Sequence, residues 1–491
     1  MTDTASSETG VLSGDSALTR VTGTLFRLSG LAALVSLLVF PLYKARPAGF
    51  LPLVLAGTLL RLIGKRRATC REALEGMPEA RFIFLLLFLP AVLQVLPIFV
   101  VQSQPQSDGL FVFREAQTLA QSGRFSPLTY YAPGQIAYYA LFFKAFGASA
   151  LVAQLCQVPL LLASVGVLYA VGQRLLPKSL ARAAALAWAV YPSTLLYVLV
   201  TPYYFYLYTL CYLLMIAGWV GAAAVPAWKR SALLGGLAAG AGALTKAVLL
   251  VAPLQALAFW GLQAGTFFRR RIWAALLLLV LGMALVIAPW AARNRRLFGE
   301  TVLVCTSGPL VLWSANNPES DGLYSPLPDE AHLETPEDMR RHMQLCREQA
   351  RSFILAHPAR FARLALRKLL HTWGTETSYV ELINRHGQPL GRLDPALRFA
   401  AQTGWALLVF LWAFAGVRDL LRRAPVSTPE LIAALVVLSK LVIYSLYEGG
   451  ARHHLPAVPF LILYIVSTWE TQSLQSATHN PKPVSQELDP P

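Results

Sequence analysis

A single aspartate follows closely on a stretch long enough to cross a membrane. Asp108 lies in SDGLFVFREAQ, about seven residues past the apolar run 83–101. A carboxylate at the outer water interface could act as a general base if it stays ionised beside a polar cavity. The pair Ser107-Asp108 also suits the start of a helix, because both residue types accept bonds from free backbone N–H groups. The residues alone leave both interpretations open.

Several cations stand at the ends or breaks of other apolar runs. Lys246 separates two short runs, Arg293 ends a run in PWAARN, Arg452 and His453 follow a run in YEGGARHH, and Lys440 lies about two turns inside that run. A sugar held through a phosphate leaves only if the departing anion is stabilised, so these five are candidate phosphate-binding residues. A lysine in the middle of a span costs about 2.5–3.5 kcal/mol on insertion scales, which favours a cavity for Lys246. Snorkelling to lipid headgroups is the alternative for each lysine and arginine.

Four polar side chains are candidates for holding a sugar or an acceptor. Tyr130 and Tyr131 could stack on a ring, and Asn316 and Asn317 could bond hydroxyl groups. As interfacial aromatics and turn residues they also have ordinary structural explanations. Glu448 is interpreted as an anchor for Arg452.

The elements that must position these residues are membrane-spanning helices. The chain of 491 residues is 55% hydrophobic and 14% charged, with a mean hydropathy of +0.50, and its apolar residues fall in long blocks. Lipid offers the backbone no hydrogen-bond partners, so each block must form a helix. The sequence therefore predicts an all-α integral membrane protein with a bundle of about twelve transmembrane helices, at roughly 24–42, 49–64, 83–101, 149–172, 183–200, 203–222, 232–246, 247–263, 272–290, 397–416, 429–446 and 454–470.

The short loops predict the orientation of this bundle. Five loops rich in Lys and Arg fall on one side of the predicted spans, and the positive-inside rule assigns that side to the cytoplasm. Two larger segments, 102–149 and 291–395, then lie outside. We predict an amphipathic helix and an aromatic turn in the first, and in the second a small outer (periplasmic) domain with a short β-like run at 300–313.

The remaining divisions follow from composition. Residues 1–22 and 472–491 are polar and predict disordered tails, the first of them cytoplasmic. The spans within 23–66 are interpreted as an added N-terminal hairpin before the transmembrane core 82–290. The segment 396–471 supplies the last transmembrane helices.

Several classes of function are disfavoured. The net charge of +16 is scattered without a basic face interleaved with aromatics, so nucleic acid is not an expected partner. Five separated cysteines indicate neither a disulfide framework nor a zinc site. Phosphate-loop, dinucleotide-binding, metalloprotease and esterase motifs are lacking, as is the DxD motif of transferases that use nucleotide sugars.

The first outer segment resembles a known loop. Residues 107–147 resemble the first outer loop of the GT-C superfamily of membrane glycosyltransferases, especially the branch with the protein O-mannosyltransferases and the lipid A aminoarabinose transferase. An Asp after a span is followed there by a helix ending near Gly, a Tyr/Pro/Gly turn and a Phe-Gly end. The corresponding residues here are Asp108, Gly123, Tyr131-Ala132-Pro133-Gly134 and Phe146-Gly147.

The resemblance extends over about three quarters of the chain, through 242–254, 288–299, 314–324, 357–374 and 447–464. It departs at two acidic positions of the family, which are occupied here by Gly109 and by Thr201-Pro202. Any role of those carboxylates in holding a metal or an acceptor is in doubt in this chain.

The resemblance implies a sugar donor on polyprenyl phosphate and a carboxylate base, here Asp108. We therefore expect a membrane glycosyltransferase that transfers sugar to an acceptor hydroxyl with inversion, on the outer face of a bacterial inner membrane. Its expected partners are the donor, membrane lipids and a glycan, lipid or protein acceptor. No cofactor is expected to be required, although the sequence leaves a divalent metal open. The alternatives are a transporter or flippase of lipid-linked sugars and a ligase or polymerase of polyprenyl-linked glycans.

Overall fold

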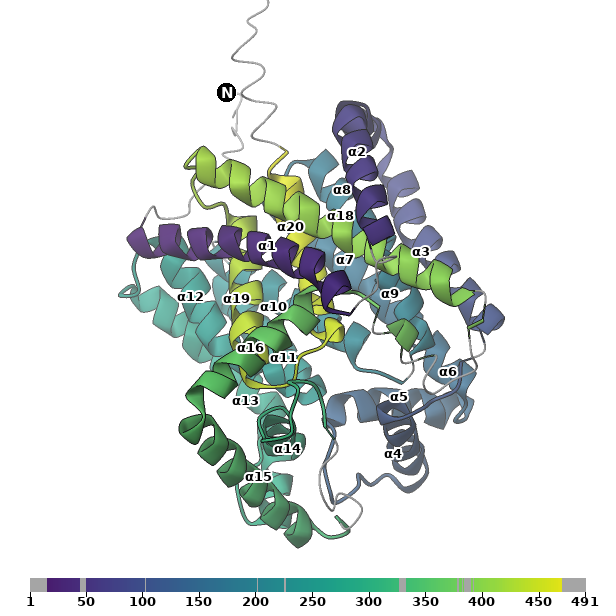
Figure 1. Ribbon diagram of the computed structural model, residues 1–491, viewed down its shortest axis with the longest axis vertical. Coiled ribbons are helices and arrows are strands. Elements are labelled where there is room, and N and C mark those ends of the chain that lie inside the picture. Colours follow the sequence, from purple (N-terminus) through teal and green to yellow (C-terminus); the bar gives the residue numbers. More distant parts are fainter. Residues whose placement is uncertain are drawn as a thin grey trace, which may run out of the picture.

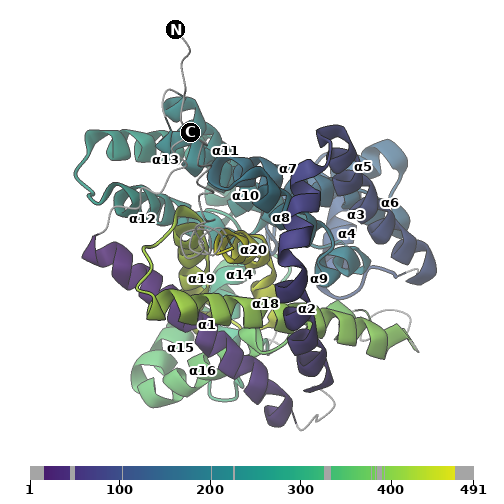
Figure 2. The same ribbon diagram turned by 90° about the horizontal axis from the view of Figure 1, so that it is seen from above.

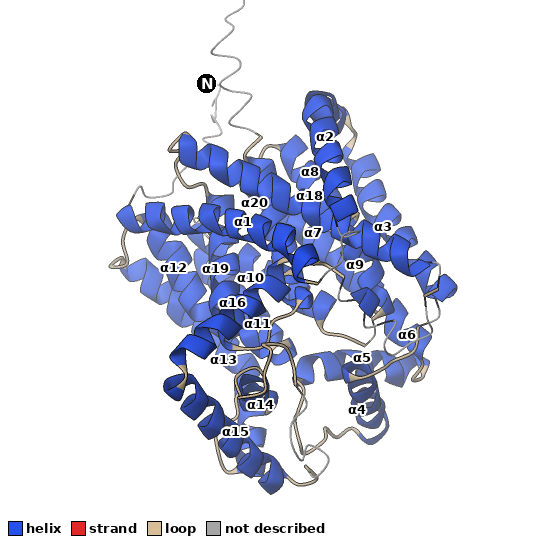
Figure 3. Cartoon of the chain, in the orientation of Figure 1, coloured by secondary structure: helices blue, strands red, loops and turns tan. Residues whose placement is uncertain are grey.

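The computed structural model describes residues 16–469, apart from 45–49, 102, 201, 225–226, 326–332, 378, 382, 384–389 and 392. Within this part of the chain the regular secondary structure is entirely helical (Figures 1 and 3). The all-α prediction is therefore confirmed for the described residues. The tail predictions concern residues that lie mostly outside them, but the first helix already begins at Ala17.

The first half of the chain forms most of the bundle. Its helices are α1 (Ala17–Tyr43), α2 (Leu51–Gly76), α3 (Glu79–Val101), α4 (Asp108–Ser122), α5 (Pro133–Phe146), α6 (Ala150–Leu155), α7 (Val158–Leu175), α8 (Lys178–Ala189), α9 (Pro192–Leu196), η2 (Tyr197–Leu199), α10 (Phe205–Ala223), α11 (Trp228–Thr245), η3 (Ala247–Val251), α12 (Ala252–Ala264) and α13 (Arg270–Phe298). The second half adds α14 (Ser307–Ser314), α15 (Pro336–Ala356), α16 (Pro358–Trp373), α18 (Leu393–Leu421), α19 (Thr428–Leu446), η5 (Ala451–His453), η6 (Leu455–Ala457) and α20 (Val458–Ser467).

Eight helical segments in the described residues are long and apolar enough to cross a membrane. The predicted number of about twelve is not confirmed. The predicted span 183–200 is broken into α8, α9 and η2, since a proline inside a helix removes a hydrogen bond and clashes with the preceding turn, and Pro192 stands at the break. The predicted span 49–64 instead belongs to a longer helix, α2, whose second half is basic and polar.

Small residues let the core helices approach closely. A Cβ added to Gly218 of α10 would lie 2.5 Å from the Cα of Gly235 in α11, and one added to Gly236 would lie 2.1 Å from the carbonyl oxygen of Leu279 in α13. Such contacts are typical of helix pairs in membranes, where packing replaces hydrophobic burial as the driving force. The small residues of α11 therefore place this helix, and the Lys246 that follows it, firmly in the bundle.

The first two helices both pack on α18, and the added N-terminal hairpin stays a prediction. α1 packs on α18 and α19, whereas α2 packs on α18 and α8. Figure 2 shows that they cross α18 at different places. The N-terminal segment is thus integrated in the bundle through α18.

The predicted β-like run at 300–313 is wrong. Residues 307–314 form helix α14, and the residues before them have no regular structure. Side chains of α13 bond this backbone in place of a strand partner, because Asn294 Nδ2 donates to Val302 O at 2.9 Å and Trp290 Nε1 donates to Val304 O at 2.6 Å. Sheet pairing is therefore not needed to satisfy these buried carbonyl groups.

The second outer segment contributes a small separate core. Its buried members come from the end of α13, the segment that follows it, α14 and α15: Phe298, Val302, Leu310, Met339, Met343 and Cys346. α16 instead packs on α1 and α19 (Figure 1). The boundaries predicted for an outer domain, 291–395, stay a prediction.

Candidate functional site

Asp108 is the first residue of α4 and stands directly after a strained residue. Ser107 has a φ of 50°, which is unusual for a residue other than glycine, and its side chain makes no capping hydrogen bond. The N-terminus of a helix favours a negative side chain, so Asp108 is well placed as an anion. Strain of this kind costs about 1–3 kcal/mol and clusters at functional sites. This makes Asp108 a candidate for function as well as for helix initiation.

The aromatic turn of the first outer segment bonds to this carboxylate. Burial raises the pKa of Tyr131, and the charge of Asp108 together with a hydrogen bond between the two side chains raises it further. A second strained residue, Thr129 with a φ of 55°, directs the chain into this turn. A Cβ on Gly134 would lie 2.8 Å from Leu244 O, so the turn packs directly on the end of α11. The turn thus brings Asp108 toward Lys246.

Arg452 approaches Asp108 from the C-terminal part of the chain. Its guanidinium forms an ion pair with Glu448. Burial acts to lower the pKa of Arg452, but Glu448, the hydroxyls of Tyr203 and Tyr204, and Asp108 outweigh burial and hold this pKa well above its ordinary value. The interpretation of Glu448 as an anchor for Arg452 is confirmed, and Asp108 lies within electrostatic reach of the same arginine.

Lys246 completes this group of charges. α11 ends at Thr245, and the Lys246 ammonium lies 4.3 Å from the ring centre of Tyr204. Burial alone would raise the pKa of Glu448, but Arg452, His453 and Lys246 outweigh it and hold the pKa below its usual range. We name Asp108, Lys246, Glu448 and Arg452 the Asp108 cluster.

Lys440 and His453 lie behind the Asp108 cluster. Lys440 is 1% exposed, and its Nζ donates to His453 O at 3.0 Å. The His453 ring stacks on Tyr444 at 4.1 Å, with Nε2 at 3.4 Å from Glu448 Oε1. Burial lowers the pKa of His453 to about 3, aided by the charge of Arg452 and opposed by Glu448, so this ring is neutral near pH 7. Both residues therefore support the loop that carries Arg452.

Arg293 is not brought to the Asp108 cluster. It lies inside the long helix α13, 4.5 Å from the ring centre of Trp290. Its guanidinium donates to Thr129 Oγ1 at 2.9 Å, Ser126 O at 2.6 Å and Phe125 O at 3.3 Å. The structure uses this arginine to hold the loop 125–129.

Asn316 and Asn317 occupy internal positions. Asn316 is 0% exposed, donates to Leu312 O and Leu446 O at 2.7 Å each, and accepts from Lys368 Nζ at 2.7 Å. Asn317 donates to Trp313 O and Ser314 O at 3.1 Å. These bonds match the turn and helix-end interpretation, and they place neither amide toward the Asp108 cluster.

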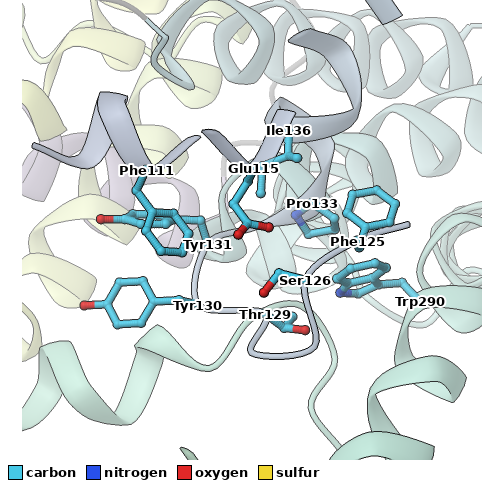
Figure 4. A pocket seen from close by; sticks show the side chains of 10 residues that line it. All are labelled: Phe111, Glu115, Phe125, Ser126, Thr129, Tyr130, Tyr131, Pro133, Ile136 and Trp290. Carbon is cyan, nitrogen blue, oxygen red and sulfur yellow. The ribbon is translucent and has the colours of Figure 1, made fainter. Parts of the chain in front are cut away.

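Tyr130 and Tyr131 line a small pocket beside α4. Ten residues line it: Phe111, Glu115, Phe125, Ser126, Thr129, Tyr130, Tyr131, Pro133, Ile136 and Trp290 (Figure 4). Since Tyr131 also bonds Asp108, the pocket adjoins the Asp108 cluster. The two tyrosines predicted to hold a sugar or acceptor are therefore placed together at this site.

Sequence reasoning missed several residues around the site. Tyr203 and Tyr204, the first two residues of the predicted span 203–222, are buried beside Arg452 and Lys246. His454 stacks on Trp405 at 3.8 Å and pairs with Glu376, which fixes the loop that carries Arg452. The sequence itself marks His454 as a candidate beside Arg452 and His453 in YEGGARHH, whereas nothing in the sequence marks Glu376 as its partner.

Metal ligation finds no ready site in the part of the chain that the structure describes. There, no three His, Cys, Asp or Glu side chains are grouped closely enough to hold an ion. The expectation that no cofactor is required stays a prediction.

Comparisons with known proteins give matches at the level of structure. No family model and no curated protein matches the sequence. The archaeal oligosaccharyltransferase AglB from Archaeoglobus fulgidus, solved with an inhibitory peptide and a dolichol-phosphate, is 13% identical with a TM-score of 0.47, over 84% of this chain and 52% of that chain. The apo form of the Archaeoglobus fulgidus oligosaccharyltransferase is 13% identical with a TM-score of 0.48, over 81% of this chain and 52% of that one.

This chain therefore spans about half the length of the neighbours it matches. Both neighbours are oligosaccharyltransferases.

Proposed function

We propose that this chain is an integral membrane glycosyltransferase that moves a sugar from a polyprenyl-phosphate donor to an acceptor hydroxyl. The observation that carries this proposal is the Asp108 cluster, in which an outer-loop carboxylate shares its surroundings with Arg452 and with Lys246 near Glu448. A base and the cations for a leaving phosphate are the two requirements of this transfer.

The mechanism follows from their arrangement. Asp108, oriented by its bond to Tyr131, accepts the proton of the acceptor hydroxyl. The acceptor oxygen then forms a bond to the anomeric carbon from the face opposite the phosphate, and the bond from that carbon to the phosphate oxygen breaks. The electron pair leaves with the lipid phosphate, whose charge Lys246 and Arg452 stabilise. The anomeric configuration is inverted.

We propose that this reaction takes place on the outer side of the membrane. The basic loops favour a cytoplasmic side opposite to Asp108, so the site faces the outer side of the membrane, as in a bacterial inner membrane. The sugar is a single hexosyl or pentosyl unit. Arg293, Lys440 and His453 act by holding the surrounding loops, because their polar contacts are made within the protein.

The test is transfer from a labelled polyprenyl-phosphate sugar by the full chain reconstituted in lipid nanodiscs. We expect the wild-type protein to transfer the label and Asp108→Asn to lose about 10²–10⁴-fold in rate, because general base catalysis contributes that much. The variant should bind the donor within about twofold of wild type, since Asp108 does not hold the phosphate. Glu348→Gln, at an exposed carboxylate of α15, is the matched control.

The same assay separates the alternatives. Transfer of a labelled polymer would identify a ligase or polymerase, and movement of the donor across the bilayer without its consumption would identify a flippase. Efficient transfer by Asp108→Asn would refute the assignment of the base.

A further inference from the structure

The pocket beside α4 combines aromatic rings with a carboxylate. In Figure 4 the Glu115 carboxylate lies between the rings of Phe111 and Tyr131 on one side and those of Phe125 and Trp290 on the other. Phe125 and Trp290 meet edge to face at 4.8 Å, and Phe111 and Tyr131 are 5.1 Å apart. The mechanism above uses none of these side chains except Tyr131.

The wall of this pocket is held in place before any ligand binds. Arg293 bonds the backbone of the loop at Phe125 and Ser126 and lies over Trp290. Ser126 in turn bonds Glu115. A preorganised wall lowers the entropic cost of binding.

Glu115 retains capacity to accept further hydrogen bonds. A carboxylate offers about four acceptor positions, and Ser126 supplies two donors, its N–H and its hydroxyl. Burial raises the pKa of Glu115, although Ser126 and Arg293 act in the opposite direction. An edge of a ligand that carries hydroxyl groups would match this half-buried acceptor.

Glu115 and Asp108 belong to the same helix, α4, so the pocket lies close to the proposed site of reaction. Glu115 lies seven residues after Asp108, which is about two helical turns or ~10 Å along the same face. Tyr131 belongs to both places, since it lines the pocket and bonds Asp108. A molecule that presents a hydroxyl to Asp108 can therefore extend into the pocket.

The charge of the pocket indicates which of the two substrates, donor or acceptor, binds there. Among the described residues that line the pocket, Glu115 is the one with a full charge, because Arg293 lies behind the wall, where Thr129, Ser126 and Phe125 accept its hydrogen bonds. The charge that faces a ligand is therefore negative and would repel a donor phosphate. The cations of the Asp108 cluster attract the donor to the other side of Asp108. This leaves the Glu115 side for the acceptor.

We propose that this pocket, formed around Glu115 by Phe111, Phe125, Tyr130, Tyr131 and Trp290, binds a sugar ring of the acceptor, so that the acceptor is itself a saccharide. The C–H faces of a sugar ring pack on aromatic rings, and its edge hydroxyls donate to Glu115 and Ser126. This inference rests on the proposed function and adds the class of the acceptor to it.

The experiment measures transfer from the labelled donor to two acceptors, an oligosaccharide and a hydroxyl-rich peptide, with the full chain in nanodiscs. We expect the oligosaccharide to be preferred. Phe111→Ala should raise its KM roughly tenfold through lost ring contact. Glu115→Gln should raise it by roughly tenfold or more through the weakened hydrogen bonds. Both effects should fall on KM for the acceptor rather than on kcat or on donor binding.

The controls keep the two proposals distinct. Phe111 is 38% exposed, so its truncation should leave the unfolding temperature near that of wild type, and Phe268→Ala, at a 92% exposed residue of a distant loop, should leave KM unchanged. Preference for the peptide, or an unchanged acceptor KM in both pocket variants, would overturn the saccharide inference while donor consumption continued. Failure of the wild-type protein to consume the donor with any acceptor would overturn the proposed function, and the inference with it.

Discussion

Two charge networks of this protein differ in how their charges are paired. In the first, which we name the Arg27 network, Arg27 makes two bonds to Glu430 at 2.6 and 2.9 Å, and Arg418 makes two to Asp419 at 2.5 and 2.9 Å. Each cation has its own carboxylate, and the result is to fasten α1 to α18 and α19. This network has no charge left for a ligand.

The charges of the Asp108 cluster are not all paired in this way. It contains two cations, Lys246 and Arg452, and two carboxylates, Asp108 and Glu448, of which Arg452 and Glu448 pair with each other. Among the ion pairs of the described residues, none includes Lys246 or Asp108. A cation without an ion-pair partner, such as Lys246, suits a site that binds an anion, whereas a network in which every charge is paired suits a structural role.

The largest effect is expected from removing one charge of the Arg27 network. Arg27→Met should lower the free energy of unfolding by about 3–5 kcal/mol, because it leaves the buried Glu430 without its partner. Thermal unfolding in detergent would measure this loss. The double variant Arg27→Met/Glu430→Leu should recover most of it, since replacing both charges by apolar groups is often neutral. A small loss of unfolding free energy in the single variant would show that the Arg27 network does not stabilise the fold.

The second-largest effect is expected from removing one cation of the Asp108 cluster. Lys246→Met should weaken binding of the polyprenyl-phosphate donor by about 1.5–3 kcal/mol, the range for hydrogen bonds to charged groups, without lowering the unfolding temperature. Binding measured by displacement of labelled donor, with the exposed Lys229→Met as control, gives both values. Lower stability with unchanged donor affinity would show that Lys246 stabilises the fold and does not bind the donor phosphate.

A smaller effect tests a buried cation that we interpret as structural. Lys368 is 0% exposed and donates to Asn316 Oδ1 at 2.7 Å, Leu446 O at 3.1 Å and Ser445 O at 3.3 Å, so the negative end of α19 stabilises it. Burial lowers its pKa to about 7, against an ordinary value of 10.5. Between these two values the unfolded chain binds a proton that the folded chain does not, so this group makes stability rise with pH from about 7 to 10.

The measurement for this effect is the unfolding temperature across that pH range. Lys368→Met should flatten the rise, whereas Lys229→Met should not. An identical pH dependence in wild type and Lys368→Met would show that the buried lysine keeps its ordinary pKa.

Sequence reasoning reached the parts of the site that local chemistry determines. An aspartate just after a span, the spacing of Glu448 and Arg452 by one helical turn and the lysine at a helix break could all be recognised from residue type and position. The all-α class followed from the apolar blocks in the same way.

The rest depended on contacts between distant segments. Arg293 stands at a plausible position in the sequence, but the loop 125–129, more than 160 residues away, determines where its guanidinium binds. Asn316 is likewise fixed by Lys368 and by the end of α19. The run at 300–313 has strand-like composition, yet Asn294 and Trp290 bond its backbone, a choice that composition cannot reveal.

The most direct test of the account is a cryo-electron microscopy structure of Asp108→Asn in nanodiscs with the polyprenyl-phosphate sugar bound. We predict that the phosphate lies between Lys246 and Arg452 with oxygens about 2.7–2.9 Å from their nitrogens, and that the sugar faces residue 108. A phosphate bound outside this cluster, with both cations turned away from it, would contradict the account.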